Sequence, residues 1–238
     1  NQCPFSAIME RSQLLDVLRA LQDPRVKLAA LVAPSASAQF PGTIEQLFSA
    51  VAELGFDEVI EVALGAELTA AHEAEEFRER IAHGEKLMTS SCCPAYVELV
   101  RRHLPDFLPH VSDTPSPMRF AAQLAADRFP GMKTVFIGPC IAKRHEAFRS
   151  GGIDYVLTFE ELGAILGGRK IDIITREPWP LPRPAAATAR NFARSCGVTE
   201  AVLAGLMQAA PDFKLDAKFL NGIDKKSLNL LKLYAAGK

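Results

Sequence analysis

The apolar and polar positions along the chain alternate between strand-like and helix-like patterns. Residues 27–32 predict a strand, in which Leu28 to Val32 are all apolar, as is typical of a strand covered on both faces. Residues 44–54 place apolar side chains at helical spacing behind Thr43, a residue suited to cap a helix. The same patterns predict further strands at residues 56–64, 86–90, 133–137 and 155–159. They predict a helix after Pro94 and helices at residues 12–21, 67–83, 115–128, 189–194, 198–209 and 224–236. A surface connection is predicted at residues 175–187.

Strands that alternate with helices imply a mostly parallel sheet with helices on its faces. We therefore expect an α/β fold of two lobes, each a mostly parallel sheet flanked by helices. The natural division lies near residue 112, which gives a first lobe at residues 9–112 and a second at residues 113–238.

Composition narrows the class of protein. The chain has 238 residues, of which 48% are hydrophobic, so it can bury a large core. Its 27 basic and 28 acidic side chains leave a formal net charge of -1, which argues against a dedicated nucleic-acid binder. No apolar run is long enough to span a membrane. The five cysteines are an odd number in a core-rich chain, which favours a reducing compartment such as the cytoplasm and metal-binding or reactive thiols.

Three predicted strands end in small residues or proline, and two of these ends carry cysteine. They are residues 33–35, 90–94 and 138–140. Ligands bind beyond the carboxyl ends of such strands, so we expect these three segments to form the mouth of one site. Pro94 begins a helix directly after Cys93, and the helix dipole there favours a thiolate suited to metal.

Free cysteines are also among the most buried residues, which is the competing interpretation. It is the one we favour for Cys196, between two predicted helices. Cys93 and Cys140 stand at strand-to-helix turns, where we favour a functional role. Their separation matches no zinc-finger spacing, so spacing alone does not identify a metal.

Two segments carry a family resemblance. Residues 90–96, Ser-Ser-Cys-Cys-Pro-Ala-Tyr, resemble the TSCCPxW motif of iron-only (FeFe) hydrogenases. Residues 138–146, Gly-Pro-Cys-Ile-Ala-Lys-Arg-His-Glu, resemble the MPCxxKxxE motif of the same family. The resemblance continues at residues 55–59, 66–69 and 154–158, and so covers most of the chain.

The resemblance implies two α/β lobes with a cofactor in the cleft between them. That cofactor is the H-cluster, a 4Fe-4S cubane joined to a two-iron unit that carries CO, cyanide and a dithiolate. By motif position, Cys93 and Cys140 fall on cubane ligands, and Cys92 on the cysteine that passes protons to the dithiolate. Lys143 falls on the cyanide-binding lysine, and further residues fall on the cofactor pocket: Ala33, Pro34, Ser35, Gly138 and Pro139.

The family's proton path can be matched in the same way. Glu73, Ser112, Glu76 and Arg80 fall on its members, and helical spacing puts the three charged residues on one face. The plainer alternative is a solvated helix face with an ion pair from Glu76 to Arg80. The role of Glu146 stays open.

The match departs from the family at both ends. The ACxGGC-like third motif, with two further cysteines, is absent, and residues 220–226 resemble the stretch before it. Residues 1–8, with Cys3, resemble the remnant of an upstream ferredoxin-like segment. We therefore expect a fragment of a longer parent, apo and inactive by itself, that holds the H-cluster weakly or not at all.

Three substitutions within the motifs point to a sensory-type or divergent branch. Gly138 replaces a methionine and is expected to leave room beside the cofactor, Met118 replaces a glutamine, and Tyr96 replaces a tryptophan.

The leading hypothesis is an H-cluster domain whose parent oxidises H2, reduces protons or senses H2. Its partners would be H2 and protons, with a ferredoxin-type electron carrier or a fused iron–sulfur domain. The alternative is a non-catalytic iron–sulfur assembly protein or an interaction domain with the same fold. Cys92, Lys143, Glu73 and Glu76 argue against assembly, because a scaffold needs no proton path.

Overall fold

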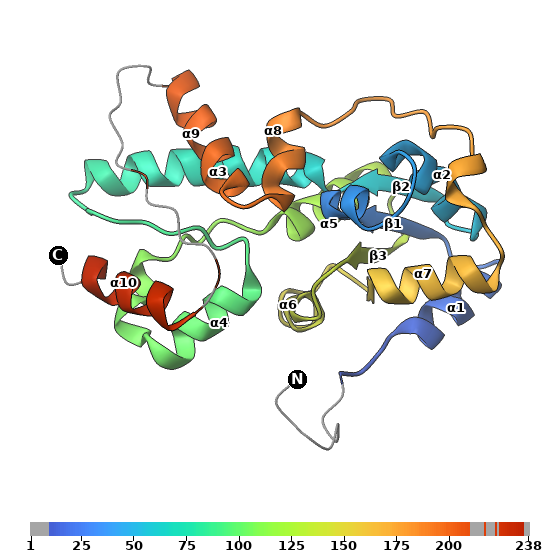
Figure 1. Cartoon of the computed structure of the whole chain (residues 1–238), viewed down its shortest axis with the longest axis horizontal. Coiled ribbons are helices and arrows are strands. Elements are labelled where there is room, and N and C mark those ends of the chain that lie inside the picture. The colour runs from blue at the N-terminus through green and yellow to red at the C-terminus, as the bar shows by residue number, and fades with distance from the viewer. Residues whose placement is uncertain (1–9, 210–216, 218–221, 223, 236–238) are drawn as a thin grey trace. The chain divides into compact units, whose positions relative to one another are not determined.

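The computed structural model describes residues 10–209, 217, 222 and 224–235, and its contacts form two compact units (Figure 1). The described part of the first unit runs up to Ile60 and then from Ala125 to Pro180. The second unit takes Glu61–Leu124 and the described residues after Leu181. The boundary expected near residue 112 lies inside the second unit. The ferredoxin-like remnant expected at residues 1–8 lies outside the described residues, as do residues 220, 221 and 223.

A four-stranded sheet forms the centre of the first unit, in the order β2-β1-β3-β4. β1 pairs in parallel with β3, and β3 pairs in parallel with β4. The α/β class with a parallel sheet is therefore confirmed. The strands are β1 (Leu28–Val32), β2 (Glu58–Glu61), β3 (Lys133–Gly138) and β4 (Tyr155–Thr158).

Every residue of β1 is buried, as its unbroken apolar run predicts for a strand between two layers. α7 contacts β3 and β4, and α1 and α6 contact β4, whereas α2 packs on the short helices η1 and η3. The helices of this unit are α1 (Leu14–Gln22), η1 (Pro34–Ala38), α2 (Ile44–Glu53), α6 (Ala142–Ser150), α7 (Phe159–Gly168) and η3 (Ile173–Thr175).

Local sequence signals fix where two of these helices begin. The Thr43 side chain accepts from the Gln46 amide while the Gln46 side chain accepts from the Thr43 amide, a capping box at the start of α2. Thr158 and Glu161 make the same reciprocal pair at the start of α7. The predicted cap at Thr43 is confirmed.

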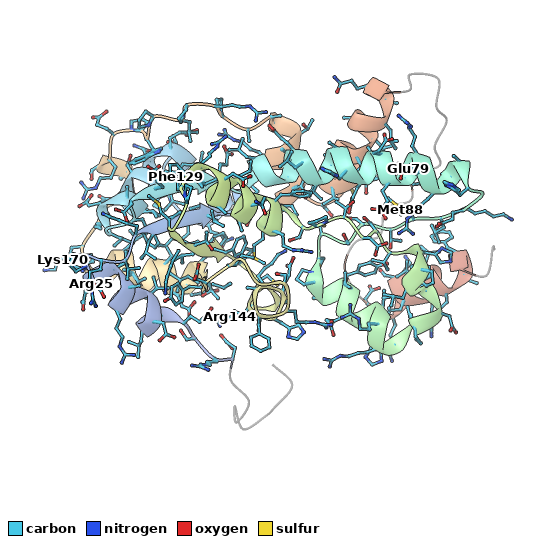
Figure 2. All side chains as sticks on the ribbon, turned by 180° about the vertical axis from the view of Figure 1, so that it is seen from behind. Arg25, Glu79, Met88, Phe129, Arg144 and Lys170 are labelled. Atoms are coloured by element: carbon cyan, nitrogen blue, oxygen red, sulfur yellow. The ribbon has the colours of Figure 1, made fainter. Side chains whose placement is uncertain are left out.

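The end of α7 shows a backbone that the sequence does not signal. Lys170, labelled in Figure 2, lies just beyond the end of α7. Its φ of 55° is in the left-handed region that glycine usually occupies. The Lys170 amide donates to the Gly167 carbonyl and the Ile171 amide to the Leu166 carbonyl, which is the Schellman pattern of hydrogen bonds. A lysine therefore carries the steric cost of a position that suits glycine.

The second unit is built around the long helix α3. α3 packs against α8 and α9, and it crosses α5 at Gly65, where an added Cβ would lie 2.2 Å from the Pro117 carbonyl oxygen. The helices of this unit are α3 (Ala63–Ala82), α4 (Pro94–His103), η2 (Pro105–His110), α5 (Pro117–Arg128, which continues into the first unit), α8 (Ala187–Arg190), η4 (Asn191–Ala193), α9 (Gly197–Ala209) and α10 (Lys225–Ala235). In the described part of the chain, no helix has the length and apolarity that crossing a bilayer requires.

The strands that we expected in two separate lobes join one sheet: β1 and β2 come from the expected first lobe, and β3 and β4 from the expected second lobe. Residues 86–90 were expected to be a strand, but only Thr89 pairs, in a single parallel bridge with Val111. The reason lies in the next amides along the chain. The Ser91 amide donates to the Glu73 carboxylate and the Cys92 amide to the Ser90 hydroxyl, so side chains replace the partners of a strand.

The strand expected at residues 56–64 is shorter than predicted. It ends at Glu61, and α3 begins at Ala63 rather than at residue 67. The first turns of α3 are almost wholly buried, and burial of an apolar run cannot by itself distinguish a strand from a helix.

Candidate functional site

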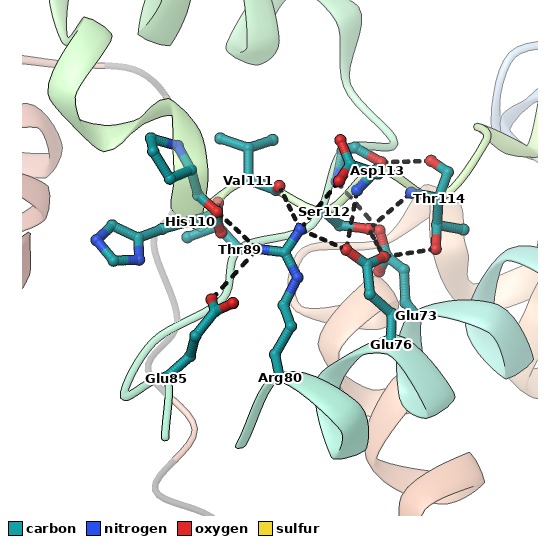
Figure 3. A network of polar contacts seen from close by, with 12 residues as sticks. Glu73, Glu76, Arg80, Glu85, Thr89, His110, Val111, Ser112, Asp113 and Thr114 are labelled. Atoms are coloured by element: carbon teal, nitrogen blue, oxygen red, sulfur yellow. Dashed lines mark hydrogen bonds and ion pairs between the residues drawn. The ribbon is translucent and has the colours of Figure 1, made fainter. Parts of the chain in front are cut away.

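The candidate site of the second unit is a polar network between α3 and the extended segment at residues 111–114 (Figure 3). Glu73, Glu76 and Arg80 lie three and four residues apart on α3, so helical geometry directs them to one face. Ser112 and Thr114 alternate along the opposing segment, which turns both hydroxyls toward that face.

Glu73 is the most deeply buried of the ionisable groups in this network, with 1% of its surface exposed. Its Oε1 accepts from the Ser90 hydroxyl at 2.7 Å and from the Ser91 amide at 3.1 Å. Burial raises the pKa of Glu73, and the charge of Glu76 adds to the rise, while these hydrogen bonds and one with Ser112 oppose it. Glu73 therefore keeps its proton to a higher pH than an exposed glutamate does.

A dense set of hydrogen-bond donors moves the pKa of Glu76 in the opposite direction. Its Oε2 accepts from the Ser112 hydroxyl at 2.5 Å and from the Thr114 hydroxyl at 2.7 Å. Its Oε1 accepts from the Asp113 amide at 3.0 Å and pairs with Arg80 at 2.7 Å. Partial burial works against the charge of Glu76, yet these hydrogen bonds and the Arg80 charge together hold its pKa below the ordinary value.

Arg80 forms the outer end of the network. Its guanidinium donates to the Pro109 carbonyl at 2.6 Å and to the Val111 carbonyl at 3.1 Å. It also pairs with Asp113 at 3.3 Å and with Glu85 at 3.4 Å. Because the Asp113 side chain is 97% exposed, Arg80 joins the buried carboxylates to solvent.

The structure thus brings together Glu73, Ser112, Glu76 and Arg80, as the sequence predicted. The plain alternative of a solvated helix face is wrong, because Glu73 is buried and the side chains of Glu76 and Arg80 are only 18% and 14% exposed. The ion pair between Glu76 and Arg80, which that alternative included, is nevertheless present. The assignment of these residues to proton transfer stays a prediction.

Cys92 and Cys93 line a cavity of about 810 Å³ in the same unit, and Glu73 lines it too. Cys93 is the residue before α4, and Pro94 occupies the first position of that helix. The rest of the lining is mainly aliphatic and comes largely from residues 86–99 and from the described parts of α9 and α10. A soft thiolate donor at the edge of an apolar cavity suits an iron–sulfur cluster, so this part of the chain fits the cofactor that the resemblance implies.

The first unit carries the other half of the predicted residues. The ends of β1 and β3 are adjacent, because the Ala33 amide donates to the Ile137 carbonyl at 2.9 Å. The expected proximity of residues 33–35 and 138–140 is thereby met. Cys140 follows β3 directly, and Lys143 lies on the first turn of α6.

Two details of this unit differ from the expectations. A Cβ at Gly138 would lie 2.5 Å from the ring of Phe136, so Gly138 leaves no room for a side chain, contrary to our expectation. The buried Phe136 ring, which the motif comparison did not consider, fills that space. Lys143 pairs with Glu146 at 2.7 Å, which gives Glu146 a partner that the sequence left open.

Cys196 is exposed, and the expectation of a buried structural cysteine is wrong. It has a φ of 69° and lies directly before α9, so it belongs to a turn and not to an apolar helix face.

Two residues that differ from the family motifs, Met118 and Tyr96, have packing partners in the structure. Met118 is fully buried, and the Tyr96 hydroxyl lies 2.7 Å from the Thr89 hydroxyl.

Sequence reasoning missed three residues that complete the network. Thr114 and the Asp113 amide both bind Glu76, and Ser90 binds Glu73. The alternation of Ser112 and Thr114 was a visible signal for two hydroxyls on one face. Among the described residues, no cluster of three histidine, cysteine or carboxylate side chains could hold a metal ion.

The described residues thus combine a parallel α/β sheet, a cysteine beyond the end of β3, and a cysteine pair beside a buried acidic network. The family model "Iron only hydrogenase large subunit, C-terminal domain" matches residues 26–232, and the chain belongs to this family.

Known relatives agree with this membership. The chain is 27% identical over 250 residues to iron hydrogenase 1 of Clostridium pasteurianum, which covers 94% of this chain and 43% of that protein. It is similar in structure to the [FeFe]-hydrogenase HydA(deltaEFG), solved in a study of stepwise H-cluster assembly. The TM-score of this match is 0.72 at 28% sequence identity, and the match covers 95% of this chain and 69% of that chain. A cysteine variant of apo [FeFe]-hydrogenase HydA1 from Chlamydomonas reinhardtii matches with a TM-score of 0.70 at 28% sequence identity. That match covers 90% of this chain and 63% of the HydA1 chain. The chain thus spans about half the length of the first curated relative.

Proposed function

We propose that this chain is the H-cluster domain of an FeFe-hydrogenase, whose whole protein oxidises H2, reduces protons or senses H2. The observation that carries the proposal is the buried relay of Glu73, Ser112 and Glu76, which begins at the cavity lined by Cys92 and Cys93. When bound, the H-cluster supplies the metal centre at which dihydrogen is split or formed.

Each residue of the relay has its own proposed role in proton transfer. Cys92 exchanges a proton with the cofactor side of the cavity, and Glu73 holds it in a neutral carboxyl group. The Ser112 hydroxyl passes it between the two carboxylates, because a hydroxyl both donates and accepts. Glu76 receives it, and Arg80 with the exposed Asp113 connects Glu76 to solvent.

Other residues hold the cofactor. Cys93 and Cys140 are the proposed thiolate ligands of the cubane, and Lys143 would bind a cyanide as a charged donor. The proposed pocket residues of the first unit are Ala33, Pro34, Ser35, Gly138 and Pro139. The donors proposed here are thiolates and an ammonium group, which suit soft iron and an anionic ligand.

An iron–sulfur assembly role is the competing function. Such a protein would hold a cluster without moving protons to a second centre. It would have no need for a buried carboxyl group, a bridging hydroxyl and an ionised partner in one line. The network therefore favours a protein that conducts protons, with H2 and protons as substrates and a ferredoxin-type or fused iron–sulfur electron partner.

A reducing compartment, the cytoplasm, agrees with the state of the thiols. None of the four cysteines in the described residues forms a disulfide, although Cys93 and Cys196 are exposed.

Iron binding tests the ligand assignment. We would reconstitute the chain anaerobically with iron and sulfide, and compare it with Cys93→Ser, Cys140→Ser and the matched control Cys196→Ser. The chain offers two assigned thiolates where a cubane takes four, so we expect it by itself to hold less than one cubane, and any specific iron to be retained in the control and lost in the other two variants. Specific iron that survives Cys93→Ser and Cys140→Ser would contradict the assignment.

Hydrogen turnover by the cofactor-loaded protein tests the proton path. Cys92→Ala and Glu73→Gln should each lower H2/D2O exchange by about 100-fold or more while the iron content stays constant, because general acid–base groups contribute at this level. Glu75→Gln, at an exposed position on the same helix, is the matched control and should exchange at the wild-type rate. If Cys92→Ala loses iron, Cys92 is a ligand and not a proton carrier.

A further inference from the structure

Glu76 has more hydrogen-bond donors than an ion pair with Arg80 would need. Two hydroxyls, one amide and one guanidinium converge on its two oxygens, and a carboxylate has about four lone-pair sites. All of these sites are therefore used while Glu76 is ionised. A proton can therefore reach Oε2 along a hydrogen bond that already ends there, from Ser112 or from Thr114.

Ser112 is fixed in a matching way. Its hydroxyl donates to Oε2 of Glu76 at 2.5 Å, and its oxygen accepts from the Thr114 amide at 3.0 Å. One lone pair of the Ser112 oxygen remains, and Glu73 lies one turn before Glu76 on α3. A protonated Glu73 that turns toward Ser112 can donate to this lone pair while Ser112 donates to Glu76.

Thr114 acts on both ends of this step. Its amide orients Ser112, and its hydroxyl donates to the same Oε2 atom that Ser112 approaches, at 2.7 Å. Of the four donors to Glu76, the amide and the guanidinium are fixed by the backbone and by Arg80's contacts with the Pro109 and Val111 carbonyls. The Thr114 hydroxyl can rotate about a single bond, and Thr114 is buried.

We propose that Thr114 is a positioning residue of the proton path, whose hydroxyl holds Oε2 of Glu76 in line with Ser112. This inference rests on the proposed function for its consequence in turnover. In the step, Glu73 gives its proton to the Ser112 oxygen as the proton of Ser112 moves to Oε2 of Glu76. One proton has then moved from Glu73 to Glu76 without any change in redox state, and Thr114 keeps its own proton throughout.

The charged groups that face Glu76 come from two elements. Arg80 and Glu73 lie on α3 with it, and Asp113 lies on the opposing segment. Glu85 pairs with Arg80. The contact between α3 and α9 is an apolar cluster that includes Phe77 and Leu206. Removal of the Thr114 hydroxyl leaves all of these charges in place.

Carbon-13 NMR titration of the glutamate carboxyl groups tests the proposal on the whole chain without a cofactor, with Glu76→Gln to assign the signal. Thr114→Val keeps the side-chain shape and the amide, and should raise the pKa of Glu76 by about 1, a tenfold change in its protonation equilibrium. Thr114→Ser keeps a hydroxyl and should restore the wild-type titration. An unchanged Glu76 titration in a folded Thr114→Val chain would overturn the proposal, as would a Thr114→Ser chain that titrates like Thr114→Val.

The pH profile of turnover by the cofactor-loaded protein separates the two proposals. We expect the acidic limb of the profile to shift upward in Thr114→Val by the same amount as the Glu76 titration, and to return in Thr114→Ser. If the titration shifts while the profile stays fixed, Thr114 does hold Glu76, but the proton path of the proposed function is wrong.

Discussion

Replacement of Glu73 by glutamine should make the protein relatively more stable as the pH rises. Glutamine has nearly the same shape and keeps an oxygen for the Ser90 and Ser91 donors, but it cannot ionise. The comparison therefore isolates the cost of a charge at a site that is 1% exposed.

The sign follows from the direction in which folding moves the pKa. Because burial raises the pKa of Glu73 in the folded protein, the unfolded chain ionises first, near the ordinary value of about 4.3. Wild-type stability falls as the pH rises from there to the raised folded value, and it is level above that value. A tenfold difference in the acid dissociation constant of one group between the folded and unfolded chain corresponds to about 1.4 kcal/mol of stability. For each tenfold difference, the stability of Glu73→Gln relative to the wild type should therefore rise by about 1.4 kcal/mol between the unfolded and the folded pKa of Glu73.

Glu76→Gln is the matched variant, and its trend should be opposite. The pKa of Glu76 is lowered in the folded protein, so its contribution to stability is present above the ordinary value and is lost as the pH falls through the lowered one. The substitution also leaves Arg80 without its closest carboxylate. We expect a loss of about 3 kcal/mol near neutral pH that shrinks in acid.

Urea unfolding followed by circular dichroism, at intervals from pH 3 to 8, measures both trends. Amide hydrogen exchange in residues 109–114 reports on the same network and is independent of cooperativity between the two units. If the two variants change in parallel with pH, or if Glu73→Gln stays at a constant offset from the wild type, then Glu73 is not the neutral carboxyl group of the pair.

Three further substitutions test the packing. Gly65→Ala should cost about 3 kcal/mol, seen as a drop of roughly 6–12 °C in Tm, because its Cβ meets the Pro117 carbonyl oxygen at 2.2 Å; an unchanged Tm would refute that contact. Gly138→Ala should be destabilising in the wild type but much less so beside Phe136→Leu, and equal costs in both backgrounds would show that the ring does not fill this space. Lys170→Gly should raise the free energy of unfolding by about 1 kcal/mol, measured by urea unfolding, and a loss of stability would argue against the left-handed backbone there.

Much of the architecture could be predicted because it depends on short-range patterns. The apolar run at residues 28–32 has no polar face, so it requires cover on both sides and becomes the central strand β1. Thr43 and Gln46 carry their capping box within four residues. The two cysteine motifs could be located in the same way, since residue order within a motif is local information.

The predictions that failed depend on which residues pack against a helix or strand. Helical spacing put Glu73, Glu76 and Arg80 on one face, but solvent or protein could have covered that face equally well. Only folding brought residues 109–114 against it, and the resulting burial raises the pKa of Glu73 while the new hydrogen bonds help to lower the pKa of Glu76. The strand expected at residues 86–90 was mispredicted for a related reason, because Glu73 accepts a hydrogen bond from the Ser91 amide at its end.

The sequence by itself thus determined the family, the positions of the proposed ligands and the face that the relay residues share, because each depends on nearby residues or on helix geometry. The tertiary structure decided that Phe136 fills the space beside Gly138, that Cys196 is exposed, and that Thr114 completes the donor set of Glu76. Burial and hydrogen bonding depend on groups that are distant in the sequence, and the charge of a carboxyl group depends on both.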